Sequence, residues 1–526
     1  MELNNVKDVL GAAIPDALDG APLEVLIVGA GPTGLALGID LARRGIRALV
    51  IERQDRLSPG ARGTGLQPRT QEVFHDLGVL DAVLASGGRY PDTALWEDGR
   101  ITSVFAMLEH VDPTPAVPYS NGLMIPQWRN QELLRARLEE LGGGVLLGTE
   151  LTSFEQDADG VTARLTLADG SARTVRAGYL VASDGGRSTV RRALGVGMSG
   201  PSLPTGLALL ADVSVDGLDR DHWHRWTQPS GAFTALLPLA GTDHFQLMTM
   251  AADDQPEASA DAVRDRIAAR THLGRDQVGE VHWTSLFRPK AGMADRFRFG
   301  RIFLAGDAAH IHSPAGGQGL NTSVQDAYNL GWKLGQVLRH DAPDTLLDSY
   351  ETERRPIAAG ILETSTRLHV TRSMRRGRDL HQLDIGYRDS PLTHELRTDI
   401  PEGALRAGDR APDAPCTTAD GTATRLFDVF QGPHFTLLAL GEVTLDPAAL
   451  PADPALLRIV HAGGPAPDLL DPDGHLRDAY GSGPGLFLVR PDGYIALAAP
   501  AEDATAHAAA ALAPYVGAGA PQPAGR

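Results

Sequence analysis

Residues 23–53, LEVLIVGAGPTGLALGIDLARRGIRALVIER, decide the fold of this chain. Residues 25–28 are apolar without alternation, which predicts a central parallel strand covered on both faces. Gly29, Gly31 and Gly34 follow in GxGxxG spacing. This spacing predicts a tight turn, a close approach of a pyrophosphate to the backbone, and close packing of the next helix on the strand.

The unit continues with a helix, a second strand and an acidic residue. Residues 35–43 are predicted to form the helix, whose free N–H groups and positive dipole end would face a phosphate. Residues 48–51 form an apolar strand that ends at Glu52, where a carboxylate can accept a hydrogen bond from a ribose hydroxyl. This order of elements predicts a dinucleotide-binding unit, which FAD and NAD proteins share.

Composition bounds the remaining possibilities. The 526 residues are enough for two or three domains, and no apolar run approaches the ~20 residues of a membrane span. The single cysteine, Cys416, rules out an intrachain disulfide and a CxxC redox or zinc site. The net charge of −18 argues against a nucleic-acid surface. We therefore expect a cytoplasmic protein, with Lys-poor, Arg-rich usage typical of a bacterial source, and no membrane, nucleic-acid or metal partner.

Two further turns of the same kind occur later in the chain. YLVASDGGRSTVRRALG places Asp184 and Gly185 between an apolar strand and a basic helix. RIFLAGDAAHIHSPAGGQGLN places Asp307 after another buried strand, and a glycine-rich loop then leads into a helix from about Leu320. Because helix N-termini stabilise negative charge, the sequence predicts that three turns face one phosphate-bearing ligand.

Changes of sequence texture predict the domain organisation. Residues 1–22 are expected to form an N-terminal arm, and residues 23–200 together with 290–395 a discontinuous nucleotide-binding domain. Residues 200–290 alternate between strands and short turns, which predicts an inserted antiparallel sheet with a face broad enough for an apolar ligand. After a Pro/Gly-rich boundary, residues 396–526 are expected to form a small α/β domain.

Three motifs in register resemble the flavin-dependent aromatic hydroxylases, the class A monooxygenases. They are GAGPTG with Glu52, SDG at 183–185, and GRIFLAGDAAH through SPAGGQGLN. ARGTGLQPRTQEV, LLDSYETERRP and GLFLVRPDGYIAL resemble the branch with phenol hydroxylase and the bacterial aromatic polyketide hydroxylases. The resemblance covers about residues 23–500. It implies a Rossmann-like FAD-binding domain, an inserted substrate-binding sheet and a thioredoxin-like domain at 396–526.

The resemblance also implies site residues. The FAD contacts would be Gly29, Gly31, Pro32, Thr33, Gly34, Glu52, Arg53, Gln127, Leu151, Asp184, Gly185, Asp307, Pro314, Gly317, Gln318, Gly319, Leu320 and Asn321. Arg187 would contact the transient nicotinamide cofactor. Arg62 corresponds to the loop arginine beside the moving flavin and is the candidate catalytic side chain. The arginine-rich run at 372–379 could bind the 2′-phosphate of NADPH or form an ordinary solvated face.

The activity implied by the resemblance is FAD-dependent hydroxylation of an aromatic substrate with NADPH or NADH and O2, through a flavin C4a-hydroperoxide. The apolar middle sheet and the polyketide branch favour a polycyclic phenol or quinone. Baeyer–Villiger insertion, modification of an antibiotic and simple ligand binding stay open, as do the choice of reductant and a homodimer. His224, His244, His282, His310 and His312 are candidates for a base, and none is assigned.

Overall fold

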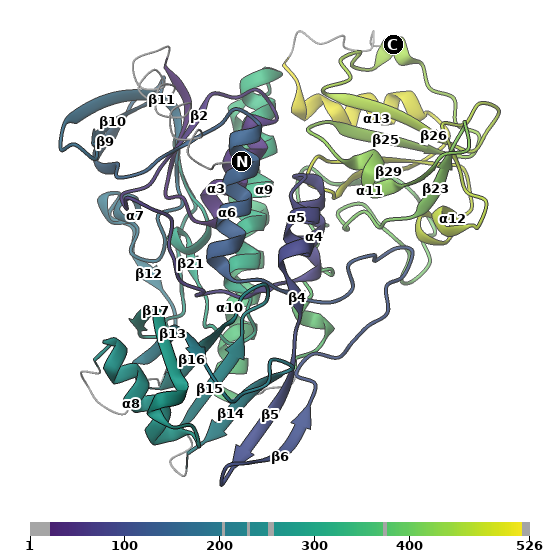
Figure 1. The fold of residues 1–526 in the computed structure, drawn as a ribbon. Helices are drawn as coiled ribbons and strands as arrows, with labels where there is room; N and C mark the ends of the chain where they lie inside the picture. The colour runs from purple at the N-terminus through teal and green to yellow at the C-terminus, as the bar shows by residue number, and fades with distance from the viewer. Residues whose placement is uncertain are drawn as a thin grey trace, which may run out of the picture.

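The fold comes from a computed structural model with three sheets of seven or eight strands (Figure 1). It describes residues 22–201, 203, 206–228, 232–250, 257–371 and 376–517. The expected N-terminal arm, residues 1–22, lies outside these ranges except for its last residue. In the described part of the chain, no helix has both the length and the apolar character needed to cross a membrane.

The first large sheet contains the parallel strands predicted from the glycine-rich turns. Val28 at the end of β1 lies level with Ile51 of β2 and Ala182 of β11, and Ala182 lies level with Leu304 of β20. Four carboxyl ends therefore meet at one edge. In spatial order the strands are β19 (Arg298–Phe299), β20 (Ile302–Leu304), β11 (Ala172–Ala182), β1 (Leu23–Val28), β2 (Ala48–Ile51) and β8 (Val145–Leu146), with β10 (Val161–Thr166) and β9 (Glu150–Gln156) continuing from β11.

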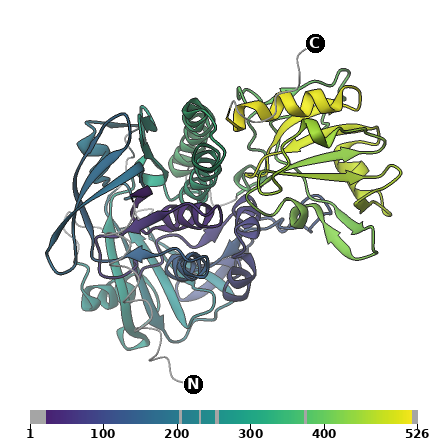
Figure 2. The ribbon, with the colours of Figure 1, turned by 90° about the horizontal axis from the view of Figure 1, so that it is seen from above.

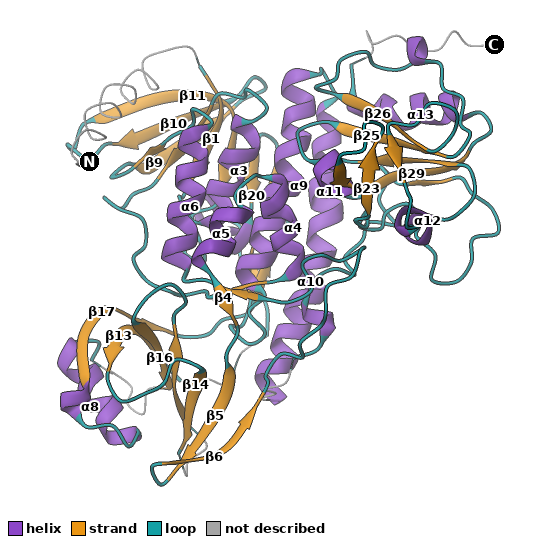
Figure 3. Cartoon of the chain, turned by 45° about the vertical axis from the view of Figure 1, so that its right-hand side comes forward, coloured by secondary structure: helices purple, strands orange, loops and turns teal. Residues whose placement is uncertain are grey.

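Helices cover this sheet, and α3, α6 and α9 run side by side in Figure 3. The first begins at Pro32, earlier than the predicted residue 35, because proline fits the first helical position. Gln127, one of the predicted FAD contacts, is the first residue of α6. The helices of this part are α3 (Pro32–Ala42), α4 (Pro68–Asp76), α5 (Leu80–Ser86), α6 (Gln127–Glu140), α7 (Thr189–Ala193), α9 (Gly319–Arg339) and α10 (Asp348–Thr371).

The described part of the chain also contains two small sheets. Each has three short antiparallel strands. They are β3 (Gly65–Leu66), β7 (Leu123–Met124) and β4 (Gly88–Arg89) in one, and β12 (Met198–Ser199), β18 (Gly292–Ala294) and β21 (His310–Ile311) in the other.

The middle sheet has seven strands, and α8 (Ala260–Arg270) packs its Val263 and Ile267 into the core on one face. Two of its strands, β5 and β6, come from a segment that the sequence analysis placed in the nucleotide-binding part, and β14 pairs with β5 in parallel. Local pattern could not show this pairing between distant segments. The order is β17 (Val278–Phe287), β13 (Ala208–Val215), β16 (His244–Met250), β15 (Phe233–Pro238), β14 (His222–Thr227), β5 (Asp92–Glu97) and β6 (Arg100–Phe105).

The C-terminal sheet lies beside the rest of the molecule in Figure 2. Its helices are α11 (Leu426–Phe430), α12 (His475–Tyr480) and α13 (Ala504–Leu512). Cys416 is buried here, and burial raises the pKa of its thiol to about 12. The strand order is β22 (His394–Glu395), β29 (Ile495–Pro500), β28 (Gly485–Val489), β25 (Phe435–Leu440), β26 (Leu457–Ala462), β27 (Leu469–Leu470), β23 (Pro415–Thr418) and β24 (Ala423–Arg425).

A buried charge network joins the C-terminal sheet to α9 and α10. Glu353 of α10 accepts hydrogen bonds from Lys333 of α9 at 2.7 Å and from Arg490 at 2.7 and 3.0 Å. Arg490 also pairs with Asp492 at 2.5 Å. Two cations and two carboxylates thus balance each other without solvent, and they tie the two parts of the molecule together.

Candidate functional site

A cavity of about 880 Å³ opens at the carboxyl edge of the parallel sheet. Gly29 and Gly31 after β1, Glu52 after β2, Asp184 after β11 and Asp307 after β20 all line it. Open α/β sheets bind ligands at this edge because the loops and helix N-termini converge there. The level ends of the four strands bring three separate sequence motifs to one site.

The first glycine-rich turn is closely packed at Gly29 and Gly34 and open toward the cavity at Gly31. Gly29 has φ of +107°, and a Cβ at this position would lie 2.5 Å from the Ser183 carbonyl oxygen. A Cβ on Gly34 would lie 2.0 Å from the Gly29 carbonyl oxygen, whereas one on Gly31 would meet no atom within 4 Å. The N-terminus of α3 has no side-chain cap, so its N–H groups fit a bound pyrophosphate.

Glu52 after β2 and Asp184 after β11 differ in how their carboxylate oxygens are hydrogen-bonded. Glu52 accepts the Ala30 N–H at 3.1 Å and the Gln54 N–H at 3.0 Å. Asp184 Oδ2 accepts the Thr189 N–H at 2.6 Å, while its buried Oδ1 has no hydrogen-bond partner in the described structure. Burial raises the pKa of Asp184. An unpaired carboxyl oxygen on the cavity wall fits a hydroxyl donor of a bound dinucleotide.

The third turn combines Asp307 with the N-terminus of α9. Desolvation at the cavity wall raises the pKa of Asp307, and the charges of His310 and Arg62 offset part of that rise. Asn321 does not line the cavity: its amide donates to the Gly317 carbonyl at 2.8 Å and to the Gly65 carbonyl at 2.9 Å. Asn321 therefore fixes the shape of the glycine-rich loop from behind.

The structure gathers the predicted residues around one cavity. Gly34 and Asn321 do not line this cavity, whereas Arg187 and the candidate catalytic Arg62 do. The role of each residue toward FAD stays a prediction. The predicted contacts that line the cavity are Gly29, Gly31, Pro32, Thr33, Glu52, Arg53, Gln127, Leu151, Asp184, Gly185, Asp307, Pro314, Gly317, Gln318, Gly319 and Leu320.

Only one of the five candidate histidines lines the cavity. His312 is buried on the wall, and its Nε2 lies 2.9 Å from Nδ1 of His310, whose Nε2 lies 2.5 Å from Asp326. Burial lowers the pKa of His312 to about 3, so His312 is neutral at ordinary pH. The other three belong to the middle sheet away from the cavity: His224 accepts the indole N–H of Trp96, and His244 stacks on His282.

The wall opposite the glycine-rich turns comes from the middle sheet and is largely apolar. Trp223, Leu237, Met248 and Trp283 line it. Rings and branched side chains of this kind form the usual surface of pockets for flat organic ligands. The apolar ligand face expected for this sheet thus lies next to the dinucleotide region, within the same cavity.

Sequence reasoning missed Arg376 and Tyr90. Both line the cavity, and the Tyr90 hydroxyl hydrogen-bonds the Arg376 guanidinium. Burial lowers the pKa of Arg376. The arginine-rich run at 372–379 indicated a charged segment, but composition alone could not show that one of its side chains points into the cavity.

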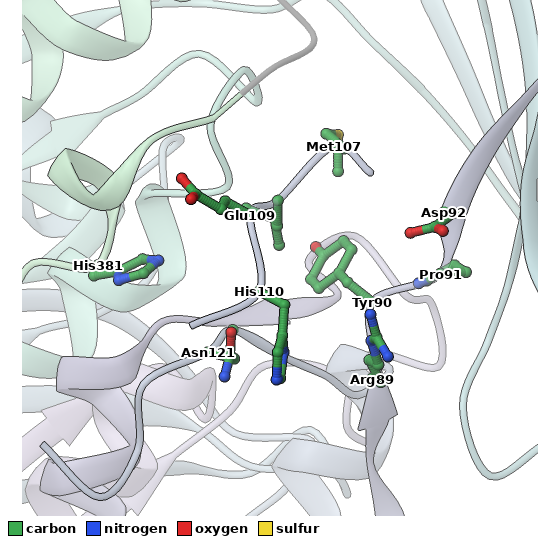
Figure 4. Close-up of a pocket in the computed structure, with 11 residues that line it drawn as sticks. Arg89, Tyr90, Pro91, Asp92, Met107, Glu109, His110, Asn121 and His381 are labelled. Atoms are coloured by element: carbon green, nitrogen blue, oxygen red, sulfur yellow. The ribbon is translucent and has the colours of Figure 1, made fainter. Parts of the chain in front are cut away.

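A second, small cavity of about 30 Å³ lies behind Tyr90. Figure 4 shows the Tyr90 ring between Met107, His110 and Arg89, with His381 at the far side. This volume suits about one water molecule. Tyr90 therefore separates a water-sized space from the main cavity.

Asp212 on β13 is a buried carboxyl beside the cavity wall. It is 1% exposed, its Oδ2 accepts the Ala61 N–H at 3.0 Å, and its Oδ1 has no partner in the described structure. Burial raises the pKa of Asp212 from 3.8 to about 6, and the bond from Ala61 offsets part of the rise. The folded protein therefore holds this proton more tightly than the unfolded chain.

The raised pKa of Asp212 predicts a pH-dependent stability. Wild-type protein should lose stability from this group as pH rises from about 4 to about 6, because the folded state must give up its proton. The shift corresponds to about 3 kcal/mol. We expect the difference in unfolding free energy between Asp212→Asn and wild type to move by that amount in favour of the variant between about pH 4 and pH 7. Urea denaturation at both pH values measures it.

Asp216 provides the matched control, because it is exposed and lies just beyond the same strand. Asp216→Asn should show an unfolding free energy that follows wild type at both pH values. A stability difference for Asp212→Asn that does not change with pH would contradict the raised pKa.

The glycine-rich turns, the cavity at the strand ends and the apolar wall define a flavoprotein with room for an organic substrate. An FAD-binding domain model matches residues 22–365, and a model of the C-terminal part of aromatic-ring hydroxylases matches residues 405–519. The chain belongs to the family of FAD-dependent aromatic-ring hydroxylases. The family, fold class and FAD cofactor predicted from the sequence are thereby confirmed.

Known relatives extend over most of the chain. A flavin-dependent monooxygenase of Mycobacteroides abscessus is 44% identical over 80% of this chain and 89% of its own length. A 12-dehydrotetracycline 5-monooxygenase/anhydrotetracycline 6-monooxygenase of Streptomyces rimosus is 36% identical over 80% and 85%. Aklavinone-11 hydroxylase, solved with FAD and aklavinone, is 30% identical, with a TM-score of 0.75 over 94% of this chain and 98% of its own. The chain is accordingly a flavin-dependent monooxygenase.

Proposed function

We propose that this monooxygenase hydroxylates a polycyclic phenol or quinone, with NADPH or NADH as the reductant. The dinucleotide region and the apolar wall share one cavity, so a flat substrate would lie between the cofactor and the middle sheet. The similarity to an anhydrotetracycline 6-monooxygenase and to aklavinone-11 hydroxylase supports a polycyclic substrate. When bound, FAD supplies the redox and oxygen chemistry. The protein must orient the ring and exclude water.

The proposal rests on the environment of Arg376. It is half-buried in the cavity, and in the described part of the chain its side chain hydrogen-bonds Tyr90 but forms no ion pair with a carboxylate. A cation without a counter-ion attracts an anionic oxygen and favours the ionised form of a phenol. We infer that Arg376 and Tyr90 hold the oxygen of the substrate ring while Trp223, Met248 and Trp283 contact its faces.

Arg62 and Arg187 are proposed to serve the reductant and the cofactor. Both line the cavity. The Arg62 guanidinium carbon lies 5.8 Å from the centre of the Trp283 ring, between the middle sheet and the dinucleotide region. A positive charge at this place would stabilise the negative charge that reduction brings into the cavity.

Anaerobic stopped-flow reduction tests the function. We expect NADPH to reduce the bound flavin slowly in the absence of substrate and much faster with one or more compounds from a panel of polycyclic phenols and quinones. Mass analysis of the aerobic product with labelled O2 should then show one added oxygen atom on an intact ring. A ring-expanded product would instead support Baeyer–Villiger insertion, and no acceleration by any compound would contradict the proposed substrate class.

The phenol identified by stopped flow should bind Arg376→Met more weakly, with a dissociation constant about 10- to 100-fold higher than in wild type. The reason is that a hydrogen bond to a charged group contributes about 1.5–3 kcal/mol. Arg376→Lys should recover part of the affinity, since it keeps the charge without the planar fork. The titration of flavin absorbance with substrate measures both. Arg378→Met, at an exposed neighbouring position, should leave the affinity unchanged. Equal affinity in Arg376→Met and wild type would remove Arg376 from the substrate site.

A further inference from the structure

One row of side chains on the middle sheet contacts a loop of the FAD-binding part. Asp212 on β13 is the register partner of Gln246 on β16 and of Trp283 on β17. Residues that lie directly opposite each other on paired strands project from the same face of a sheet. The three side chains therefore form a single row, and the loop at residues 59–62 lies against it.

Two side chains of the row hydrogen-bond the backbone N–H and the backbone carbonyl of Ala61. Asp212 Oδ2 accepts the Ala61 N–H at 3.0 Å, and the Gln246 amide donates to the Ala61 carbonyl oxygen. The Trp283 ring packs so closely on Gly60 that a Cβ there would lie 2.1 Å from it. Three strands thus fix two consecutive loop residues, and Ala61 has no exposed surface.

The next residue in the loop is Arg62, which is exposed toward the cavity. Its guanidinium carbon lies 5.8 Å from the centre of the same Trp283 ring, and its charge opposes the rise in the pKa of Asp307. The backbone held at Ala61 therefore sets where this arginine stands between the middle sheet and the third glycine-rich turn.

A carboxyl group at position 212 lowers the stability of the fold, so packing does not explain its presence. Asp212 is buried, and one of its two carboxyl oxygens has no hydrogen-bond partner in the described structure. A group left unsatisfied inside a protein lowers stability, and such groups persist where function requires them. The choice of a carboxyl at the centre of the row thus indicates a role beyond the core.

We propose that Asp212, together with Gln246 and Trp283, is a positioning element that holds Arg62 on the cavity wall opposite Asp307. The middle sheet, which forms the apolar wall, thereby sets the place of a cation next to the dinucleotide region. The part of this inference that concerns flavin reduction rests on the proposed function. The part that concerns the loop does not.

Hydrogen exchange tests the hold on the loop in the full-length protein. We expect amides in peptides that span residues 58–66 to exchange at least about 10-fold faster in Asp212→Ala than in wild type, because the hydrogen bond that protects Ala61 is lost. Asp212→Asn keeps an acceptor and should restore slow exchange. Asp216→Ala, at an exposed position beyond the same strand, should match wild type. Equal exchange in Asp212→Ala and wild type would overturn the proposal.

A double-mutant cycle tests the link to Arg62. The measured quantity is the anaerobic rate of flavin reduction by NADPH without aromatic substrate, so it reports even if the proposed substrate class is wrong. We expect Asp212→Ala and Arg62→Ala each to slow reduction by about 10- to 100-fold, as displacement of a positioned group does. The double variant should be no slower than Arg62→Ala alone. Losses that multiply, or a normal rate in either single variant, would show that Asp212 does not act through Arg62.

Discussion

Replacement of Gly34 by alanine is expected to yield a destabilised protein that does not retain FAD. The new Cβ would lie 2.0 Å from the Gly29 carbonyl oxygen and 2.6 Å from the Ser183 hydroxyl oxygen. Overpacking of this kind costs about 1–3 kcal/mol where neighbours can move, and here the neighbour is the backbone of the turn itself. The ratio of flavin to protein absorbance and the thermal midpoint of the purified protein measure the effect.

Gly31→Ala separates the fold from the ligand, because a Cβ there meets no atom within 4 Å and the backbone has an ordinary φ of −72°. This variant should fold normally, but its methyl group would lie on the cavity wall where the resemblance to the family predicts that the pyrophosphate of FAD approaches. A clash of about 1–3 kcal/mol predicts FAD binding weaker by about 5- to 150-fold.

Gly360→Ala is the control for both variants. Gly360 is exposed in α10, and a Cβ on it would contact nothing. The Gly360→Ala variant should therefore bind FAD normally and gain up to about 1 kcal/mol of helix stability. Unchanged FAD affinity in Gly31→Ala would contradict the placement of the pyrophosphate at the first turn.

Glu353→Gln is expected to lower the unfolding free energy by about 3–5 kcal/mol, the usual cost of breaking a buried ion pair on one side. The substitution leaves Lys333 and Arg490 with Asp492 as the single carboxylate of the network. Burial lowers the pKa of Lys333 to about 8, and loss of Glu353 should lower it further. Urea denaturation followed by far-UV circular dichroism measures the loss of stability.

Limited proteolysis locates the damage in Glu353→Gln. Because the network joins α9 and α10 to the C-terminal sheet, the link between these parts should become sensitive first. Glu363→Gln is the matched control, on the same helix at an exposed position. It should show wild-type stability and wild-type digestion. Equal unfolding free energies for Glu353→Gln and Glu363→Gln would mean that the network does not hold the C-terminal part.

Local sequence was sufficient for the dinucleotide-binding unit. The strand at 48–51 has the predicted bounds, and Glu52, singled out by the order of strand, glycine turn and acid, lines the cavity. These features depend on residues close together in the chain, where apolar runs and glycines act directly on the backbone. Three such units with parallel strands then had to converge, because parallel strands end at one edge of the sheet.

Contacts between distant segments were decided only by the tertiary structure. Strands β5 and β6 join the middle sheet from a segment more than a hundred residues away, and Arg376 turns into the cavity rather than toward solvent. Asp212 meets Ala61 across 151 positions of sequence. The sequence alone determined the family, the cofactor and the glycine-rich turns that line the cavity. Packing between sheets determined the apolar wall of the cavity and the charged side chains beside it, because burial and pairing of distant groups depend on the whole fold.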